Sequence, residues 1–131
     1  MKRLDYIVYT GNCHCNAIKF EIYAPIHLSI VECNCTICYV TGFLHLHVEN
    51  KDFTLICGKS QLSTYSFNTM IAQHTFCKIC GVKSFYKPRS HPKDYSINFR
   101  CLNIPITSTV GKSFFDGKHW EDNIEKFSST T

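Results

Sequence analysis

The sequence contains no long apolar run and no recognisable leader. A helix that spans a bilayer needs roughly 18 or more mostly apolar residues, and no segment approaches that length. A secretory leader begins with a basic segment followed by an apolar run, whereas Lys2, Arg3 and Asp5 interrupt the start of this chain. These absences predict a cytoplasmic or nuclear protein that is not secreted and has no membrane partner.

A strong excess of one charge is also lacking. Lys and Arg number 14 against 10 Asp and Glu, which gives a net charge of +4 and a pI of about 8.6. That pI is below the value above about 9 that indicates a dedicated nucleic-acid-binding domain, although it permits an anionic partner. The 131 residues, 44% of them hydrophobic, are enough for one domain with its own core. We expect a single domain over 1–131, with its core at about 6–127.

Cysteine, in contrast, is abundant. Nine cysteines in 131 residues indicate either a disulfide framework or metal ligation. Clustered cysteines favour metal in the reducing compartment expected here, because thiols stay reduced there. The odd number of cysteines also fits a fully paired disulfide framework poorly.

Polar and apolar residues alternate with a period of two in many short segments, as β-strands require. In 17–23, Ile18, Phe20 and Ile22 fall on one face, with Lys19 and Glu21 on the other. Because turn residues separate these segments, the pattern predicts a mostly β, antiparallel domain. The other expected strands cover 4–10, 28–33, 43–48, 53–57, 62–67, 73–76, 82–87 and 95–100.

One helix is expected near the C-terminus. Asp116 is a suitable N-cap, since its carboxylate can accept from the first free N–H groups of a helix. Trp120, Ile124 and Phe127 then recur at i, i+4 and i+7, which is the apolar stripe of an amphipathic helix.

Seven of the cysteines form three clusters, in which neighbours are separated by only one or two residues. Zinc binds thiolates tetrahedrally, and such close pairs reach one ion from a tight turn. Seven ligands divide into four for a closed, structural site and three for a site with an open position, which a catalytic zinc requires. The middle cluster alone holds three cysteines, so we assign it the open site. The predicted ligands are Cys13, Cys15, Cys77 and Cys80 at the structural zinc, and Cys33, Cys35 and Cys38 at the open zinc.

These clusters and their flanking residues resemble the glutathione-dependent formaldehyde-activating enzymes and their eukaryotic branch, centromere protein V. The resemblance covers nearly the whole chain from about Gly11, and order, spacing and flanking residues all match. The stretch 64–90 looks closest to the centromere protein V branch. The matching segments are GNCHC at 11–15, AIKFE at 17–21, CNCTIC at 33–38, YSFNT at 65–69, AQHTFCKICGV at 72–82, SFYKPRS at 84–90 and RCL at 100–102.

The resemblance implies a fold, a pair of zinc sites and an activity. It implies a β-tent of short sheets, a structural four-cysteine zinc, and a catalytic zinc at Cys33, Cys35 and Cys38. The implied activity is that of a carbon–sulfur lyase or synthase, which joins formaldehyde to glutathione as S-hydroxymethylglutathione. Glutathione would then be the thiol co-substrate and a small aldehyde the second substrate. The chain departs from the bacterial enzymes at Asn12 and Asn16, where glycine is usual, and at Tyr39, where a basic residue is common.

Several other residues have both a functional and a structural interpretation. His14 and His74 lie near predicted ligands, and we expect them to support those ligands or to lie at the surface. His45 and His47 share one strand face, which is expected to be solvated, although they follow the open site closely enough for a general base. The two cysteines outside the clusters, Cys57 and Cys101, are expected to be buried structural thiols.

A basic stretch at 78–93 supports a second function. It contains Lys78, Lys83, Lys87, Arg89 and Lys93 without an acidic residue. It could bind glutathione carboxylates or nucleic-acid phosphates, or form a solvated loop. The alternative to an enzyme is therefore a non-catalytic zinc module at chromatin, as the centromere protein V branch suggests. A third possibility is a sensor whose middle cluster releases zinc on oxidation.

Overall fold

The structure is a computed structural model that describes residues 5–67, 69–119 and 121. Within these residues the chain is mostly β, as the alternating pattern predicts, with helical segments of six residues or fewer. The strands are β1 (Tyr6–Asn12), β2 (Lys19–Pro25), β3 (His27–Cys33), β4 (Leu44–Val48), β5 (Phe53–Cys57), β6 (Leu62–Tyr65), β7 (His74–Cys77), β8 (Phe85–Tyr86), β9 (Tyr95–Asn98) and β10 (Thr109–Phe115).

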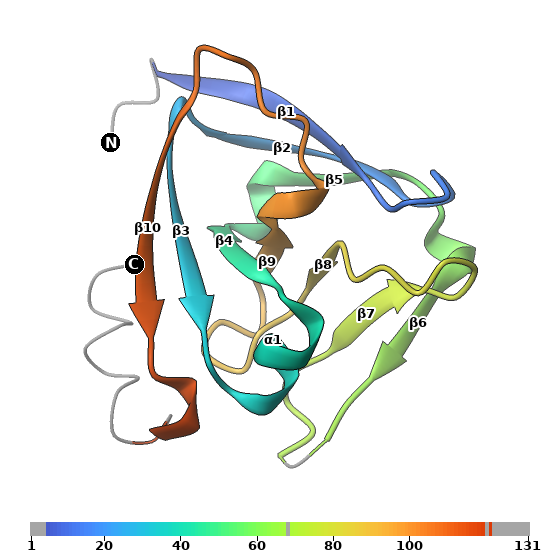
Figure 1. The fold of residues 1–131 in the computed structure, drawn as a ribbon. Coiled ribbons are helices and arrows are strands. Elements are labelled where there is room, and N and C mark those ends of the chain that lie inside the picture. Colours follow the sequence, from blue (N-terminus) through green and yellow to red (C-terminus); the bar gives the residue numbers. More distant parts are fainter. Residues whose placement is uncertain (1–4, 68, 120, 122–131) are drawn as a thin grey trace.

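The strands form three small sheets (Figure 1). The first has the order β1-β2-β5, the second β10-β3-β4-β9-β8, and the third is the β6-β7 hairpin. In β2 the predicted alternation is confirmed, because Phe20, Ile22 and Ala24 are buried while Lys19 is exposed. β2 therefore turns one apolar face toward the interior.

The expectation of a wholly antiparallel arrangement is wrong at one pair. β10 runs parallel to β3, with Thr109 opposite His27 and Phe115 opposite Cys33. A period of two identifies a strand but carries no information on its direction. Two parallel strands need a long connection, and the many residues between β3 and β10 provide one. The sequence pattern also missed β10 itself, because its residues are largely exposed and lack a clear apolar face.

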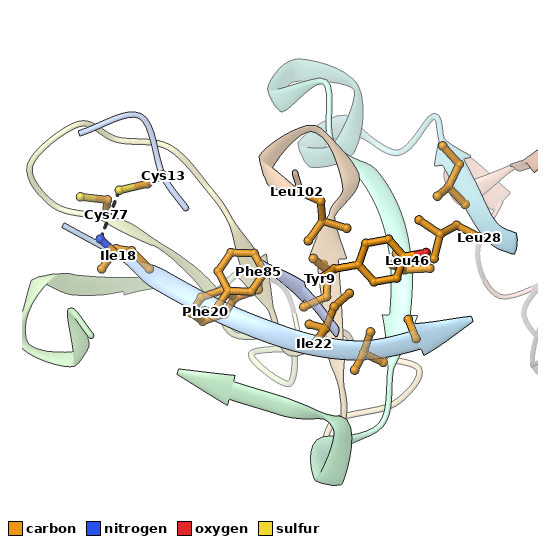
Figure 2. Packing of buried hydrophobic residues seen from close by; sticks show 14 residues of the cluster. Tyr9, Cys13, Ile18, Phe20, Ile22, Leu28, Leu46, Cys77, Phe85 and Leu102 are labelled. Carbon is orange, nitrogen blue, oxygen red and sulfur yellow. Dashed lines mark hydrogen bonds between the residues drawn. The ribbon is translucent and has the colours of Figure 1, made fainter. Parts of the chain in front are cut away.

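The core lies between the first two sheets (Figure 2). Phe20 of β2 meets Phe85 of β8 edge to face, with ring centroids 5.4 Å apart. Tyr9 is 1% exposed, and its hydroxyl donates to the carbonyl of Pro25 over 2.7 Å. At one end of the core, Figure 2 shows Cys13 and Cys77 beside Ile18. Cys13, which follows β1, and Cys77, the last residue of β7, thus close the core at that end.

A short helix that the sequence pattern did not predict joins β3 to β4. This helix, α1 (Thr36–Thr41), ends at Gly42, whose φ of 66° is the left-handed conformation that glycine adopts freely. The predicted C-terminal helix depends on Trp120, Ile124 and Phe127, which lie outside the described residues. Among the described residues, a 3-10 turn, Gly117–His119, follows Asp116. In the described part of the chain, no helix has the length and apolar character needed to span a bilayer.

Candidate metal centres and cavity

The structure brings four of the predicted ligands together. The Sγ atoms of Cys13, Cys15, Cys77 and Cys80 all lie within 4.8 Å of one another. Cys13 to Cys15 and Cys15 to Cys77 are each 3.7 Å apart, sulfur to sulfur. Two sulfurs bound to one zinc at ~2.3 Å in a tetrahedron would be separated by ~3.8 Å, so the cluster has the dimensions of a four-thiolate site.

Local backbone geometry positions these sulfurs. The N–H groups of Ile79 and Cys80 point at Cys77 Sγ, at 3.4 and 3.5 Å, and lower the pKa of that thiol. Gly81, with φ of 78°, then reverses the chain so that its N–H donates to the Cys77 carbonyl. Asn16 has φ of 67°, and asparagine tolerates this conformation better than most residues. Asparagine can therefore occupy this position without the glycine that the resemblance leads us to expect.

The second cluster is built around α1. Cys33 ends β3, Cys35 is the N-cap of α1 and Cys38 lies one turn further. Residues three apart on a helix lie on the same side, so Cys35 and Cys38 face one point. The Sγ atoms of Cys33, Cys35 and Cys38 are within 4.8 Å of one another. The structure therefore groups the seven cysteines as four and three.

A glycine that the sequence analysis missed lies against this second cluster. A Cβ added to Gly117 would collide with Cys33 Sγ and lie 2.9 Å from Cys35 Cβ. Asn34 fixes this contact, because its side-chain amide donates to Asp116 Oδ1 and its oxygen accepts from the Lys118 N–H. The cluster is thus enclosed on one side by backbone that follows β10, 82 residues away from Asn34.

The ionisation of the three-cysteine cluster fits a cation. Cys33 and Cys38 hydrogen-bond to Cys35 and lower its pKa to about 2. The pKa values of Cys33 and Cys38 are raised, chiefly through hydrogen bonding with Cys35 and Cys33 respectively. One thiol of the cluster therefore loses its proton readily, and loss of a second proton is unfavourable unless a bound cation compensates the added negative charge. Thiolate donors in this number suit zinc among the common metals.

The three-cysteine cluster, unlike the four-cysteine one, lines a cavity of about 560 Å³. This volume is within the range of roughly 300–1,000 Å³ typical of small-molecule sites. The walls come from β3, α1, β4, the start of β7, the segment 86–91 and the end of β10. Polar side chains at the walls include His45, His47, His74, Arg89 and Lys118.

His45 belongs to this site, and the expectation of a solvated strand face is wrong for it. Its Nε2 lies 3.1 Å from Cys38 Sγ, and its Nδ1 lies 2.8 Å from Ser96 Oγ. Burial, reinforced by the nearby charge of Lys83, lowers the pKa of His45 to about 3, so the ring is neutral. A Cys38 thiolate held by a metal ion could only accept, so with metal bound the ring proton would be on Nε2 and the Ser96 hydroxyl would donate to Nδ1.

The remaining histidines and cysteines are distributed differently. His47 also lines the cavity, where its Nε2 lies 3.2 Å from Asp94 Oδ2. His14 is exposed, as one of its two interpretations required. Cys57 is exposed and not the buried thiol that we expected, whereas Cys101 is half-buried, and burial raises its pKa. All nine cysteines are free thiols.

A family model and a solved structure are both similar to this chain. A sequence model of the family described as glutathione-dependent formaldehyde-activating enzyme matches residues 8–115, which include all seven clustered cysteines. The crystal structure of a protein from Rhodobacter sphaeroides is also similar to this chain. It shares 26% sequence identity and a TM-score of 0.66, over 79% of this chain and 99% of the bacterial one.

Proposed function

Because this chain belongs to the family of glutathione-dependent formaldehyde-activating enzymes, we propose that it forms and breaks a carbon–sulfur bond between glutathione and a small aldehyde. The observation that carries this proposal is a cluster of three cysteine sulfurs within 4.8 Å of one another on the wall of a 560 Å³ cavity. Three protein thiolates leave one tetrahedral position for a fourth ligand from the cavity.

Two zinc ions would be held by the two cysteine clusters, with different roles. Cys13, Cys15, Cys77 and Cys80 would saturate a structural ion that joins the loop after β1 to β7. Cys33, Cys35 and Cys38 would hold the second ion at the cavity. An ion bound there would favour the thiolate form of an incoming glutathione, since metal coordination deprotonates a thiol.

The protein's own residues would orient both substrates. Arg89 and Lys118 at the cavity wall offer positive charge to the two carboxylates of glutathione. His45 donates Nε2–H to Cys38 and so holds this ligand in place. Phe67, Phe115 and the Tyr86 ring supply apolar wall that excludes water from the reacting sulfur.

The test is an exchange measurement by NMR on the zinc-loaded protein with glutathione and formaldehyde. We expect the protein to accelerate interconversion of glutathione and S-hydroxymethylglutathione above the uncatalysed rate. A Cys35→Ser variant should lose this acceleration, whereas Cys57→Ser, which changes an exposed cysteine outside both clusters, should retain it. Wild-type protein with two bound zinc ions and no acceleration would contradict the proposal.

The alternative, a non-catalytic module at chromatin, rests on the basic stretch 78–93. Burial weakens it, because Lys83 is only 8% exposed and Arg89 lines the cavity. Of the five basic side chains, Lys78 and Lys93 are exposed. Salt-dependent DNA binding that disappears on reversing these two charges would favour the chromatin role, and binding that survives the reversal would argue against it.

A further inference from the structure

His74 is a buried histidine in the wall of the cavity that holds the three-cysteine cluster. It is 5% exposed and begins β7, whose first residue lies opposite Tyr65 of β6. Its ring is stacked between Tyr86, with centroids 4.7 Å apart, and Phe67, with centroids 5.4 Å apart. Two flat neighbours on opposite sides fix the plane of the imidazole, so its nitrogen atoms have defined directions.

Lys83 determines which nitrogen of His74 carries the proton. Its Nζ lies 2.6 Å from His74 Nδ1. An ammonium group has three donors and no acceptor, so Nδ1 must accept and the ring proton must be on Nε2. Burial, together with the charge of Lys83, lowers the pKa of His74 to about 4, which keeps the ring neutral. The cavity is thus lined by an imidazole whose N–H has no protein partner among the residues that the structure describes.

Lys83 is itself in an unusual place. Its Nζ lies 3.9 Å from the centroid of the Tyr86 ring and 4.9 Å from that of Phe43. No carboxylate within the described ranges forms an ion pair with it, and the charges that favour its protonated form are those of Cys38 and Cys35. Burial lowers its pKa to about 8. A buried ammonium held by a histidine beside a thiolate cluster is the kind of costly arrangement that active sites retain.

Three other histidines line the cavity and each has a partner, with Nδ1 of His91 2.9 Å from Ser90 Oγ. His45 has both ring nitrogens occupied, by Cys38 on one side and by Ser96 on the other. His47 is paired with Asp94. His74 is therefore the imidazole whose donor is available to a molecule in the cavity.

We propose that His74 is a catalytic residue that donates its Nε2–H to the aldehyde oxygen during carbon–sulfur bond formation, with Lys83 as the positioning residue that fixes this tautomer. The inference rests on the proposed function. The glutathione sulfur forms a bond to the carbonyl carbon, and the electrons of the C=O π bond move to oxygen. The oxygen takes the Nε2 proton while Lys83 passes a proton to Nδ1, which leaves His74 neutral. To restore the starting state, Nε2 takes a proton from water in the cavity while Nδ1 returns its proton to Lys83.

Kinetics of three variants test this role. His74→Phe keeps a flat ring between Phe67 and Tyr86 but has no donor, and we expect about a 10²-fold loss of kcat with KM for glutathione little changed. His74→Gln, which offers a side-chain N–H, should recover part of that loss. His27→Phe, the same change at an exposed histidine away from the cavity, should have wild-type kinetics. Zinc content and thermal unfolding of each variant are measured alongside.

A readout independent of turnover is the ¹⁵N NMR spectrum of the imidazoles. We expect wild-type protein to show His74 as the Nε2–H tautomer and Lys83→Met to show a mixture with Nδ1–H. A wild-type Nδ1–H tautomer would overturn the inference whatever the activity. If the wild type is active and the folded, zinc-loaded His74→Phe variant keeps kcat within about threefold of it, the inference about His74 is overturned and the proposed function is left intact. An inactive, zinc-loaded wild type would remove the proposed function and this role with it.

Discussion

The side-chain amide of Asn34 donates to Asp116 Oδ1 over 3.0 Å and so joins the loop of the three-cysteine cluster to the end of β10. Through this contact, the backbone of Gly117 lies against Cys33 and Cys35. The cluster is local in sequence, but its surroundings are completed by a distant segment. Substitutions far from the cysteines should therefore affect the metal that they hold.

Gly117→Ala should displace Cys33 Sγ, because the added Cβ would occupy its position. We expect the zinc content to fall from two ions to about one per chain while the four-cysteine cluster and the fold remain. Native mass spectrometry gives the stoichiometry. Gly111→Ala is the matched control in β10, since its Cβ would meet only His27 atoms at 3.4 Å or more. Two ions in both variants would show that Gly117 does not form part of the site.

Loss of a ligand should have different effects in the two clusters. Cys35→Ser should retain the fold and bind about one zinc, because its cluster lines the cavity and the core does not depend on it. Cys80→Ser should unfold or precipitate, since a structural zinc contributes an apparent ~10–16 kcal/mol to folding. Circular dichroism and zinc stoichiometry measure both effects. A folded Cys80→Ser protein that keeps one zinc ion, or a Cys35→Ser protein that unfolds, would contradict these roles.

The buried pair formed by His74 and Lys83 should reduce stability at neutral pH. Replacing a buried charge and its partner by apolar groups of similar size often stabilises a protein by about 1–4 kcal/mol. We therefore expect the double variant Lys83→Met, His74→Phe to unfold at a higher denaturant concentration than wild type, and to be inactive. Chemical denaturation of the zinc-loaded proteins at pH 7 measures the difference. A double variant less stable than wild type would show that the pair is structural.

Acid should destabilise the protein in part through His74. Its folded-state pKa, about 4, lies below its ordinary value of 6.5, so between these values the unfolded chain binds a proton that the folded protein excludes. The contribution of His74 to the free energy of unfolding is complete above pH 6.5. It decreases as the pH falls toward 4, by at most about 1.4 kcal/mol per pH unit. His74→Phe should show a shallower decrease in the free energy of unfolding over this interval. Equal slopes in both proteins would contradict the assignment. Both proteins contain the same cysteines, so the effect of cysteine protonation on stability is the same in each and drops out of the difference.

The sequence predicted the cysteine groups because their order and spacing directly limit which sulfurs can meet. It predicted most of β2 because the alternation there is clear and one face is buried, and it predicted β5, in which Phe53 and Leu55 are half-buried. It could not predict the direction of β10, the short helix α1 or the role of Gly117, since each depends on contacts between distant segments. Lys83 was assigned to a basic stretch, yet its side chain turns inward, and no local pattern distinguishes a buried lysine from a solvated one.

One short strand joins the four-cysteine cluster to the wall of the cavity. β7 carries Cys77 of the four-cysteine group at one end and His74 at the other, three peptide units or roughly 10 Å apart. The hairpin partner β6 holds this strand in register, with Leu62 opposite Cys77 and Tyr65 opposite His74. A chelator that strips only the saturated cluster would therefore also disorder the imidazole at the far end. Inhibition by such a reagent would result from loss of the fold that the structural cluster stabilises, and not from direct removal of an ion at the cavity.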